Sequence, residues 1–188
     1  MVTRATVVRP VEHHEHATLG ELTVTVYREA LASELVDYAP VLRDVAGRLA
    51  AGCEVLVAED GGRLIGGVTY VPGPGPYAQL AGHHEAELRM LVVDPGAQGK
   101  GTGAELVRAC IDRAVTAGRH GLALGTMPEM AAARRLYERL GFVRVPARDG
   151  FVPGDRPLLC YWLDLGATDA ADCSSEPSAA GGVEGTAR

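Results

Sequence analysis

The stretch Val92–Ala104, VVDPGAQGKGTGA, decides the fold, because it joins a buried strand to the start of a helix. The residues before it, 85–93 (EAELRMLVV), end in an apolar run that is typical of a strand buried on both faces. Residues 101–117, which begin within it, place apolar side chains at helical spacing. This order of strand, glycine turn and helix predicts an anion site, because free N–H groups and the helix dipole meet at a helix start.

The turn contains the residues that a phosphate site needs. Gly99, Gly101 and Gly103 let the backbone approach a phosphate without interference from a Cβ atom. Lys100 adds positive charge at the same place. The turn is therefore expected to hold a phosphate-bearing ligand, and its identity depends on which glycine motif fits.

Two common phosphate motifs fit this turn poorly. A Walker A loop requires G-x-x-x-x-G-K-[ST], but Gly96 stands only three residues before Gly99, and Lys100 is followed by Gly101. The dinucleotide fingerprint fits only in its relaxed form, G-x-G-x-x-A, from Gly99 to Ala104. No clear acidic strand end lies about 20 residues further on, as that fingerprint requires. A nucleotide-binding protein that uses Lys100 remains one alternative.

A third motif, Q-x-x-G-x-G, fits at Gln98, Gly101 and Gly103. In this setting it resembles the pyrophosphate loop of the GNAT superfamily of acetyl-CoA-dependent N-acetyltransferases. Residues 131–142, AAARRLYERLGF, are similar to the A-x-x-L-Y-x-x-L-G-F helix of the same superfamily. The resemblance covers about residues 3–165.

The resemblance implies an α+β fold, a GNAT-like single domain with a mixed central sheet of about six or seven strands flanked by about four helices. This domain is expected over residues 1–166. The tail 167–188 lacks large apolar groups and is expected to be disordered. From the sequence pattern, the expected helices are 12–32, 40–50, 101–117 and 130–140. The expected strands are 5–11, 54–59, 64–71, 85–93, 121–126, 142–145 and 158–165.

The resemblance also implies acetyl-CoA as cosubstrate. In this family the pantetheine arm lies along the central strand and bonds to its backbone, while the diphosphate lies on the glycine turn. The expected cofactor contacts are Leu91, Val92, Val93, Gln98, Gly99, Lys100, Gly101, Thr102, Gly103 and Ala104. One position departs from the family pattern, because many members carry Asn where this chain has Met130, and no cofactor contact is assigned there.

The resemblance implies two catalytic residues. Tyr137 is expected to protonate the leaving thiolate as general acid. Glu87 is expected to accept the amine proton as general base, with Glu85, His83 and His84 as alternatives at the same end of the strand. Each has a purely structural alternative, a packed ring for Tyr137 and an ion pair with Arg89 for Glu87. Simple strand alternation would put Glu87 and Arg89 on one face with Leu91 and Val93.

Composition excludes few other roles. The chain of 188 residues has a formal net charge of −6, which argues weakly against a nucleic-acid partner. We expect no membrane partner and a cytoplasmic location, because there is no signal peptide and no apolar run of about 18 residues. The four cysteines are scattered and expected to be reduced. The cluster of His13, His14 and His16 with Glu12 and Glu15 is predicted to be a solvated helix face, so no metal is expected.

The sequence therefore predicts an N-acetyltransferase that moves an acetyl group from acetyl-CoA to a primary amine by direct attack in a ternary complex. The acceptor is expected to be a small-molecule amine or an amine of a protein, and a homodimer is left open. The alternative from another class is a non-catalytic acyl-CoA-binding sensor, which would keep the glycine turn and lose the acid.

Overall fold

The computed structural model describes residues 6–31, 38–152 and 155–166. Its strands are β1 (Val7–Pro10), β2 (Glu54–Asp60), β3 (Arg63–Val71), β4 (Glu85–Val93), β5 (Gly121–Thr126), β6 (Val143–Arg144), β7 (Gly150–Val152) and β8 (Arg156–Asp164). Its α-helices are α1 (His16–Leu31), α2 (Ala39–Arg43), α3 (Val45–Ala50), α4 (Thr102–Thr116) and α5 (Ala131–Arg139). Short 3-10 turns are η1 (His13–Glu15), η2 (Pro95–Ala97) and η3 (Pro146–Arg148).

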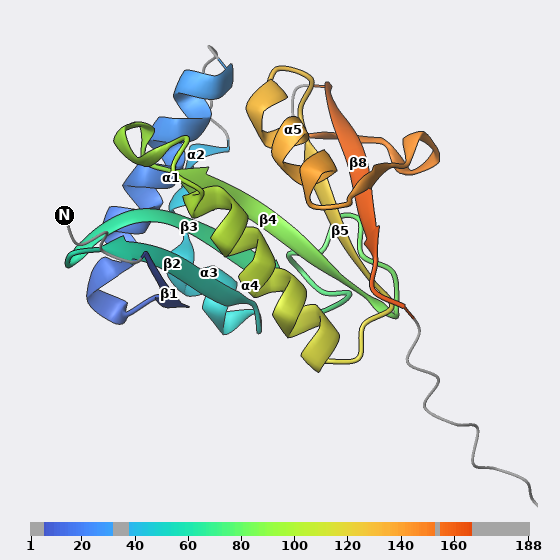
Figure 1. Cartoon of the computed structure of the whole chain (residues 1–188), viewed down its shortest axis with the longest axis horizontal. Coiled ribbons are helices and arrows are strands. Elements are labelled where there is room, and N and C mark those ends of the chain that lie inside the picture. Colours follow the sequence, from blue (N-terminus) through green and yellow to red (C-terminus); the bar gives the residue numbers. More distant parts are fainter. Residues whose placement is uncertain (1–5, 32–37, 153–154, 167–188) are drawn as a thin grey trace, which may run out of the picture.

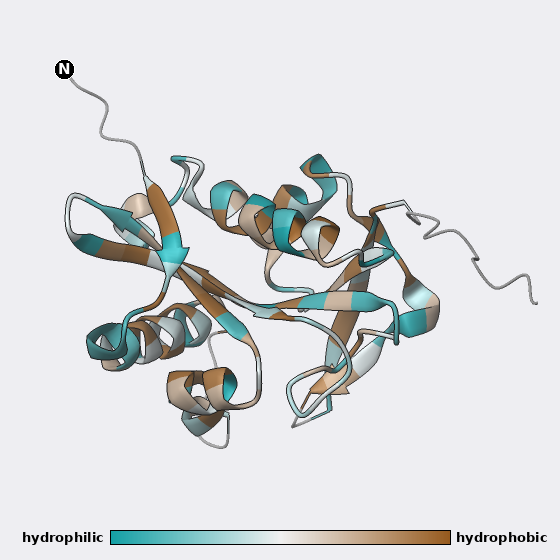
Figure 2. Ribbon diagram, turned by 90° about the horizontal axis from the view of Figure 1, so that it is seen from below, coloured by the Kyte–Doolittle hydropathy of each residue, from teal (hydrophilic) through white to brown (hydrophobic). Residues whose placement is uncertain are grey.

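The strands form one mixed sheet in the order β1-β2-β3-β4-β5-β8-β6, and β7 pairs with β8 beside this path. Only the pairing of β4 with β5 is parallel, and α4 makes the crossover between them. Helices cover both faces of the sheet: α4 and α5 lie in front of it in Figure 1, and α1 to α3 lie behind it. Figure 2 shows the same layers from below, with apolar (brown) and polar (teal) residues alternating along the helices. The predicted α+β fold is confirmed.

Two local predictions were wrong. The helix expected over 40–50 is broken at Asp44 into α2 and α3, because Asp44 leaves the helical conformation (ψ 69°) and its side chain accepts the N–H of Gly47. The expected strands were also incomplete, because residues 150–152 form strand β7, which exists through its pairing with β8. The tail 167–188, expected to be disordered, lies outside the described residues.

The parallel ladder between β4 and β5 is short. It runs from Glu85 paired with Gly121 to Leu88 paired with Leu124, and it ends there. Strand β4 continues to Val93 against β3 alone. The two strands therefore part at the C-terminal edge of the sheet, and backbone of β4 beyond Leu88 has no strand on its β5 side within the described chain. We call this opening the wedge.

A β-bulge in β4 lies at the start of the wedge. Val92 pairs with Gly67 and Arg89 with Thr69, so two residues of β4 oppose the single Val68 of β3. The first of these two is Met90, whose φ is +54°, in the region where residues other than glycine are uncommon. The bulge is held by tertiary packing, because the Met90 side chain is buried in a cluster with residues of α1 and α2.

The bulge corrects the prediction of a single face for Glu87, Arg89, Leu91 and Val93. Leu88 and Leu91, three positions apart, both pack against the core cluster that contains α4. The extra residue at the bulge reverses the alternation of side chains, so Glu87 lies on the face opposite Leu91. Strand β4 thus presents Leu91 and Val93 toward α4, and Glu87 and Arg89 toward α1 to α3.

A buried ionic network joins β1 to the start of α1. Both Nη atoms of Arg9 donate to the carboxylate of Glu15 at 2.8 Å, and Arg9 also donates to Glu59. The backbone N–H of Glu12 donates to the same Glu15 carboxylate. These bonds, chiefly those from Arg9, lower the pKa of Glu15 from 4.5 to about 2.

Glu15→Gln is expected to lower the free energy of unfolding at pH 7 by about 2 kcal/mol. Because the folded pKa lies below the unfolded one, this contribution exists above pH 4.5 and disappears as pH falls toward 2. Urea unfolding of both proteins at pH 7 and at pH 3 measures it. A difference that does not shrink at pH 3 would show that the charge of Glu15 is not its source.

Candidate functional site

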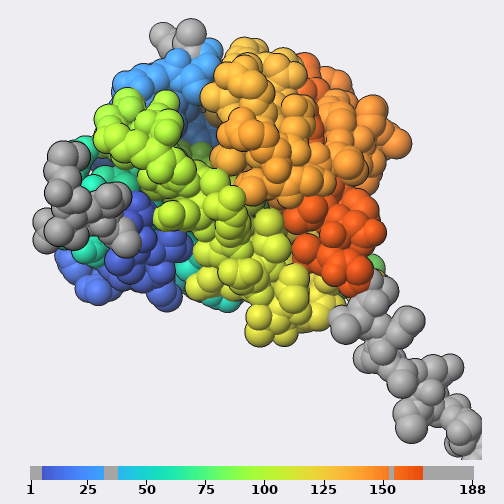
Figure 3. Space-filling view, viewed as in Figure 1, coloured from blue at the N-terminus to red at the C-terminus, as the bar shows by residue number. Residues whose placement is uncertain are grey.

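A cavity of about 800 Å³ opens at the wedge. Figure 3 shows it as a hollow where the blue α1, the green glycine turn and the orange α5 meet. Three walls enclose it. The α1 wall is made by Val26, Tyr27, Glu29 and Ala30; the floor by Leu91, Val93, Ala97, Gln98, Gly99, Gly101, Thr102, Gly103 and Ala104; and the α5 wall by Glu129, Met130, Ala131, Ala132, Ala133, Arg135, Leu136 and Arg139.

The glycine turn forms the floor through its backbone. Gly99 has φ +75° and Gly101, the N-cap of α4, has φ +93°, conformations that residues with a Cβ rarely adopt. A Cβ added at either glycine would have no atom within 4 Å, so it would stand in open space. The first N–H groups of α4 have no helical partner, which suits them to an anion.

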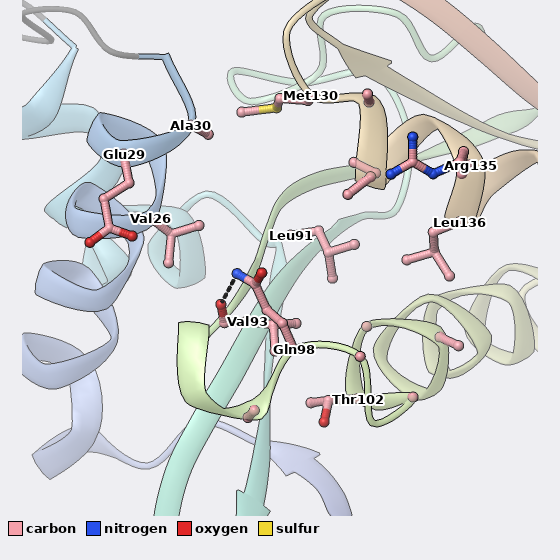
Figure 4. A pocket seen from close by; sticks show the side chains of 18 of the residues that line it. Val26, Glu29, Ala30, Leu91, Val93, Gln98, Thr102, Met130, Arg135 and Leu136 are labelled. Atoms are coloured by element: carbon pink, nitrogen blue, oxygen red, sulfur yellow. Dashed lines mark hydrogen bonds between the residues drawn. The ribbon is translucent and has the colours of Figure 1, made fainter.

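Side chains of the glycine turn hydrogen-bond to nearby backbone groups and so hold the turn in shape. The Gln98 amide donates to the carbonyl of Val93 at 3.2 Å (Figure 4), and the Asp94 carboxylate accepts the N–H of Gly96. Lys100 Nζ donates to the Gly96 carbonyl at 2.9 Å. Of the ten predicted cofactor contacts, eight line the cavity; Val92 and Lys100 do not. The Val92 side chain is buried on the other face of β4.

Tyr137 lies in the core beneath the α5 wall. Its side chain is buried, with its ring tilted against Phe142 and Tyr161. In the described chain its hydroxyl has no hydrogen-bond partner, whereas Tyr161 donates its own to Glu138. Burial, and next the neighbouring Tyr27, raise the pKa of Tyr137 well above its usual value. Tyr137 therefore stays protonated, and its electrostatic contact is with a residue that lines the cavity.

A second pocket, of about 40 Å³, adjoins the cavity on the Glu87 face of β4. The two share Tyr27 and Met130. Around the smaller pocket stand Tyr38, Gln79, Glu87, Arg89, Met90, Gly125, Thr126, Met127, Val152 and Leu158. The bulge thus places Glu87 beside a pocket that borders the cavity without lining the cavity itself.

Glu87 is 1% exposed and anchors a loop. Its Oε2 accepts the backbone N–H groups of Gln79, Leu80 and Ala81 at 2.8, 2.8 and 3.2 Å. Its Oε1 lies 3.8 Å from Nε of Arg89, which itself donates to the carbonyl of Tyr77. One oxygen of Glu87 is therefore occupied by the loop, and the other has only a distant ion pair.

The alternatives to Glu87 are placed further from the cavity. Glu85 is paired with Arg148 and accepts the N–H of Gly82. The ring of His84 is stacked on that of His120 at 5.0 Å. None of these residues lines the cavity or the second pocket.

Sequence reasoning missed several wall residues. Met130, which lines both pockets, and Arg135 belong to the α5 wall, which meets the glycine turn only in the fold. Met130, to which no cofactor contact was assigned, lies on the α5 wall in Figure 4. Arg135 could have been noticed in the sequence as part of an unusual run of arginines in a helix.

Two further observations concern other kinds of site. Among the described residues, no group of three or more His, Cys, Asp or Glu side chains is arranged to hold a metal ion. Within the same residues, every helix is too short or too polar to cross a membrane.

Comparison with known proteins finds one matching family and two related sequences. Residues 19–142 match the model of the Acetyltransferase (GNAT) family. The chain is 32% identical to the L-amino acid N-acyltransferase MnaT of Escherichia coli K12 over 118 residues. The matched region is 63% of this chain and 64% of that protein. It is also 33% identical to the L-methionine sulfoximine/L-methionine sulfone acetyltransferase of Salmonella typhimurium over 114 residues. That matched region is 61% of this chain and 62% of the relative. The chain thus spans slightly less than two thirds of either relative.

The fold is also similar to solved structures. The structure of yncA from Salmonella typhimurium with its cofactor acetyl-CoA superposes with a TM-score of 0.64 and 25% identity. That similarity covers 90% of this chain and 99% of yncA.

Proposed function

Because the chain belongs to the GNAT acetyltransferase family, we propose that it transfers an acetyl group from acetyl-CoA to a primary amine by direct attack. The observation that carries this proposal is the cavity at the wedge, where a glycine turn at a helix start meets a strand edge that has no partner in the described chain, with the buried Tyr137 behind the α5 wall and outside the lining itself. A sensor would need the first two features but not the third.

The residues present fit acetyl-CoA. Gly99 and Gly101 leave open space where any other residue would place a Cβ, and the free N–H groups at the start of α4 can hold the diphosphate. The edge of β4 at Leu91 and Val93 can bond the pantetheine amides as an added strand does. When bound, acetyl-CoA supplies the acetyl thioester. The expected contacts at Val92 and Lys100 stay predictions, since neither residue lines the cavity.

Tyr137 is proposed as the general acid. Its raised pKa keeps the hydroxyl protonated across the physiological range, and no described residue competes for that proton. A buried donor of this kind can protonate a departing thiolate. Its ring packing secures its position, so the structural and catalytic roles are compatible.

Glu87 is proposed as the general base, acting through Oε1. The N–H groups of the loop hold Oε2, which fixes the carboxylate in place. Oε1 is left facing Arg89, at the pocket that borders the cavity. A proton from the amine can reach it directly or through one water molecule.

We propose that the acceptor is a small amine that carries a carboxylate. Two arginines lie on the Glu87 face: Arg89, which is partly buried beside the second pocket, and Arg48, which is 1% exposed and donates to Thr69 on the neighbouring strand. Glu87 is the only fully buried carboxylate described near them. The excess of buried positive charge favours an anionic group on the ligand. The substrates after which the two relatives are named, amino acids and their analogues, are of this class.

The test is thiol release from acetyl-CoA with a panel of amines, checked by mass detection of the acetylated product. Amino acids are expected to be acetylated, and polyamines, aminoglycosides and lysine-containing peptides to be poorer acceptors. Tight CoA binding with no product from any amine would support the sensor instead. A rise in melting temperature with ATP but not with acetyl-CoA would indicate a nucleotide-binding protein.

A further inference from the structure

Two arginines of α5 stand on the cavity wall without a partner. Arg135 and Arg139 both line the cavity and are exposed to solvent. Within the described chain, neither has a hydrogen bond or an ion pair with any other residue. They are four positions apart on one helix, so their side chains are neighbours and their charges repel. Like charges at this spacing destabilise a helix slightly, and a ligand that brings negative charge would relieve that repulsion.

The pair lies across the cavity from the glycine turn. Leu136, next to Arg135, packs against the start of α4: a Cβ added at Gly103 would come 3.2 Å from its Cδ2. The α5 wall and the free N–H groups of α4 therefore face the same part of the cavity. The opposite wall carries Glu29 of α1, and Figure 4 shows Glu29 and Arg135 on opposite sides. The α5 wall also includes one carboxylate, Glu129, which lies 3.6 Å from Arg156. A phosphate is thus attracted to the two arginines of the α5 wall and repelled by Glu29.

We propose that Arg135 and Arg139 bind phosphate groups of the coenzyme and complete, from the second wall, the anion site begun by the glycine turn. This inference rests on the proposed function, because it takes CoA as the ligand. The guanidinium fork suits phosphate, since it donates two parallel hydrogen bonds and is always charged. The phosphate can be the diphosphate or the ribose 3′-phosphate of CoA, and the two are separated by experiment.

The experiment compares three variants by calorimetric titration of the full chain. Arg135→Gln and Arg139→Gln remove one charge each from the wall. The control is Arg108→Gln, which removes an exposed arginine of α4 that does not line the cavity. Each protein is titrated with CoA and with dephospho-CoA, at low and at high salt.

Each wall variant is expected to bind CoA about tenfold more weakly, as the loss of a hydrogen bond to a charged group implies. The dependence of affinity on salt should weaken in both, because one screened attraction is gone. A loss seen with CoA alone identifies the 3′-phosphate, and an equal loss with dephospho-CoA identifies the diphosphate. Arg108→Gln should remain within about twofold of the unchanged protein. The melting temperature of the unliganded wall variants should stay level or rise, since a repulsive pair is removed.

Affinity for CoA within about twofold of the unchanged protein in both wall variants would overturn the inference. So would an equal loss in Arg108→Gln, since that would show an effect of overall charge. These readouts do not require turnover. A chain that binds CoA with these preferences but acetylates no amine would contradict the proposed enzymatic function and leave the arginine site supported.

Discussion

Tyr137→Phe is expected to lower turnover by about 100-fold and to change the affinity for acetyl-CoA by less than about threefold. The change removes one hydroxyl and keeps the ring that packs against Phe142 and Tyr161. Folding should be almost unaffected, because that hydroxyl has no partner in the described chain. The acid that protonates the leaving thiolate is lost, so the chemical step alone should slow. Steady-state kinetics with a competent amine, together with calorimetric titration of CoA, measures the two effects separately.

Tyr161→Phe is the matched control. Tyr161 is also a buried tyrosine, its ring lies 6.4 Å from that of Tyr137, and its hydroxyl donates to Glu138, whereas the hydroxyl of Tyr137 has no partner in the described chain. Turnover in this variant should stay within about twofold. If Tyr137→Phe turned over as fast as the unchanged protein, Tyr137 would have no part in the mechanism. If both variants slowed equally, the cause would be packing of the aromatic cluster.

Gly101→Val is expected to abolish measurable CoA binding. Gly101 caps α4 with φ +93°, a conformation that is least accessible to a β-branched residue, and its Cβ would project into the open space of the cavity. Two effects therefore combine. The backbone strain costs about 1–2 kcal/mol of stability. The side chain also occupies the space proposed for the diphosphate.

Gly118→Val separates these two effects. Gly118 follows the C-terminal end of the same helix, has φ +63° and also has no atom within 4 Å of an added Cβ, but it lies outside the cavity. This control should lose a similar amount of stability and still bind CoA normally. Circular dichroism, thermal unfolding and calorimetry on both variants make the comparison. A folded Gly101→Val protein that binds CoA with unchanged affinity would remove the glycine turn from the binding site.

Local sequence patterns were enough to predict the elements that form the cavity floor. Strand β4 and strand β5 have the bounds that their apolar runs predict, and the glycine turn between β4 and α4 is recognisable because positive φ requires glycine there. The break at Asp44 could have been predicted, because an aspartate inside a helical segment can cap a new helix and interrupt the preceding one. These features depend on residues close together in the chain.

The rest depends on contacts between distant segments. No glycine marks the bulge at Met90, whose unusual backbone is imposed by packing against α1 and α2, so no local pattern contradicts simple alternation. That error put Glu87 on the wrong face. The second pocket needs the loop around Leu80, which is held by charged side chains of β4 and by Arg148, a residue of η3. Such long-range anchoring has no signature in a single sequence.

The short ladder between β4 and β5 has a mechanical consequence. The sheet consists of two halves, β1 to β4 and β5 with β8, β6 and β7, and the ladder between them has only four residue pairs in the described chain, from Glu85–Gly121 to Leu88–Leu124. Those pairs act as a hinge, and the angle between the halves fixes how wide the wedge stands. Tight packing across the hinge, where Ala86, Leu122 and Leu124 are fully buried, therefore governs the shape of a cavity that these side chains do not line.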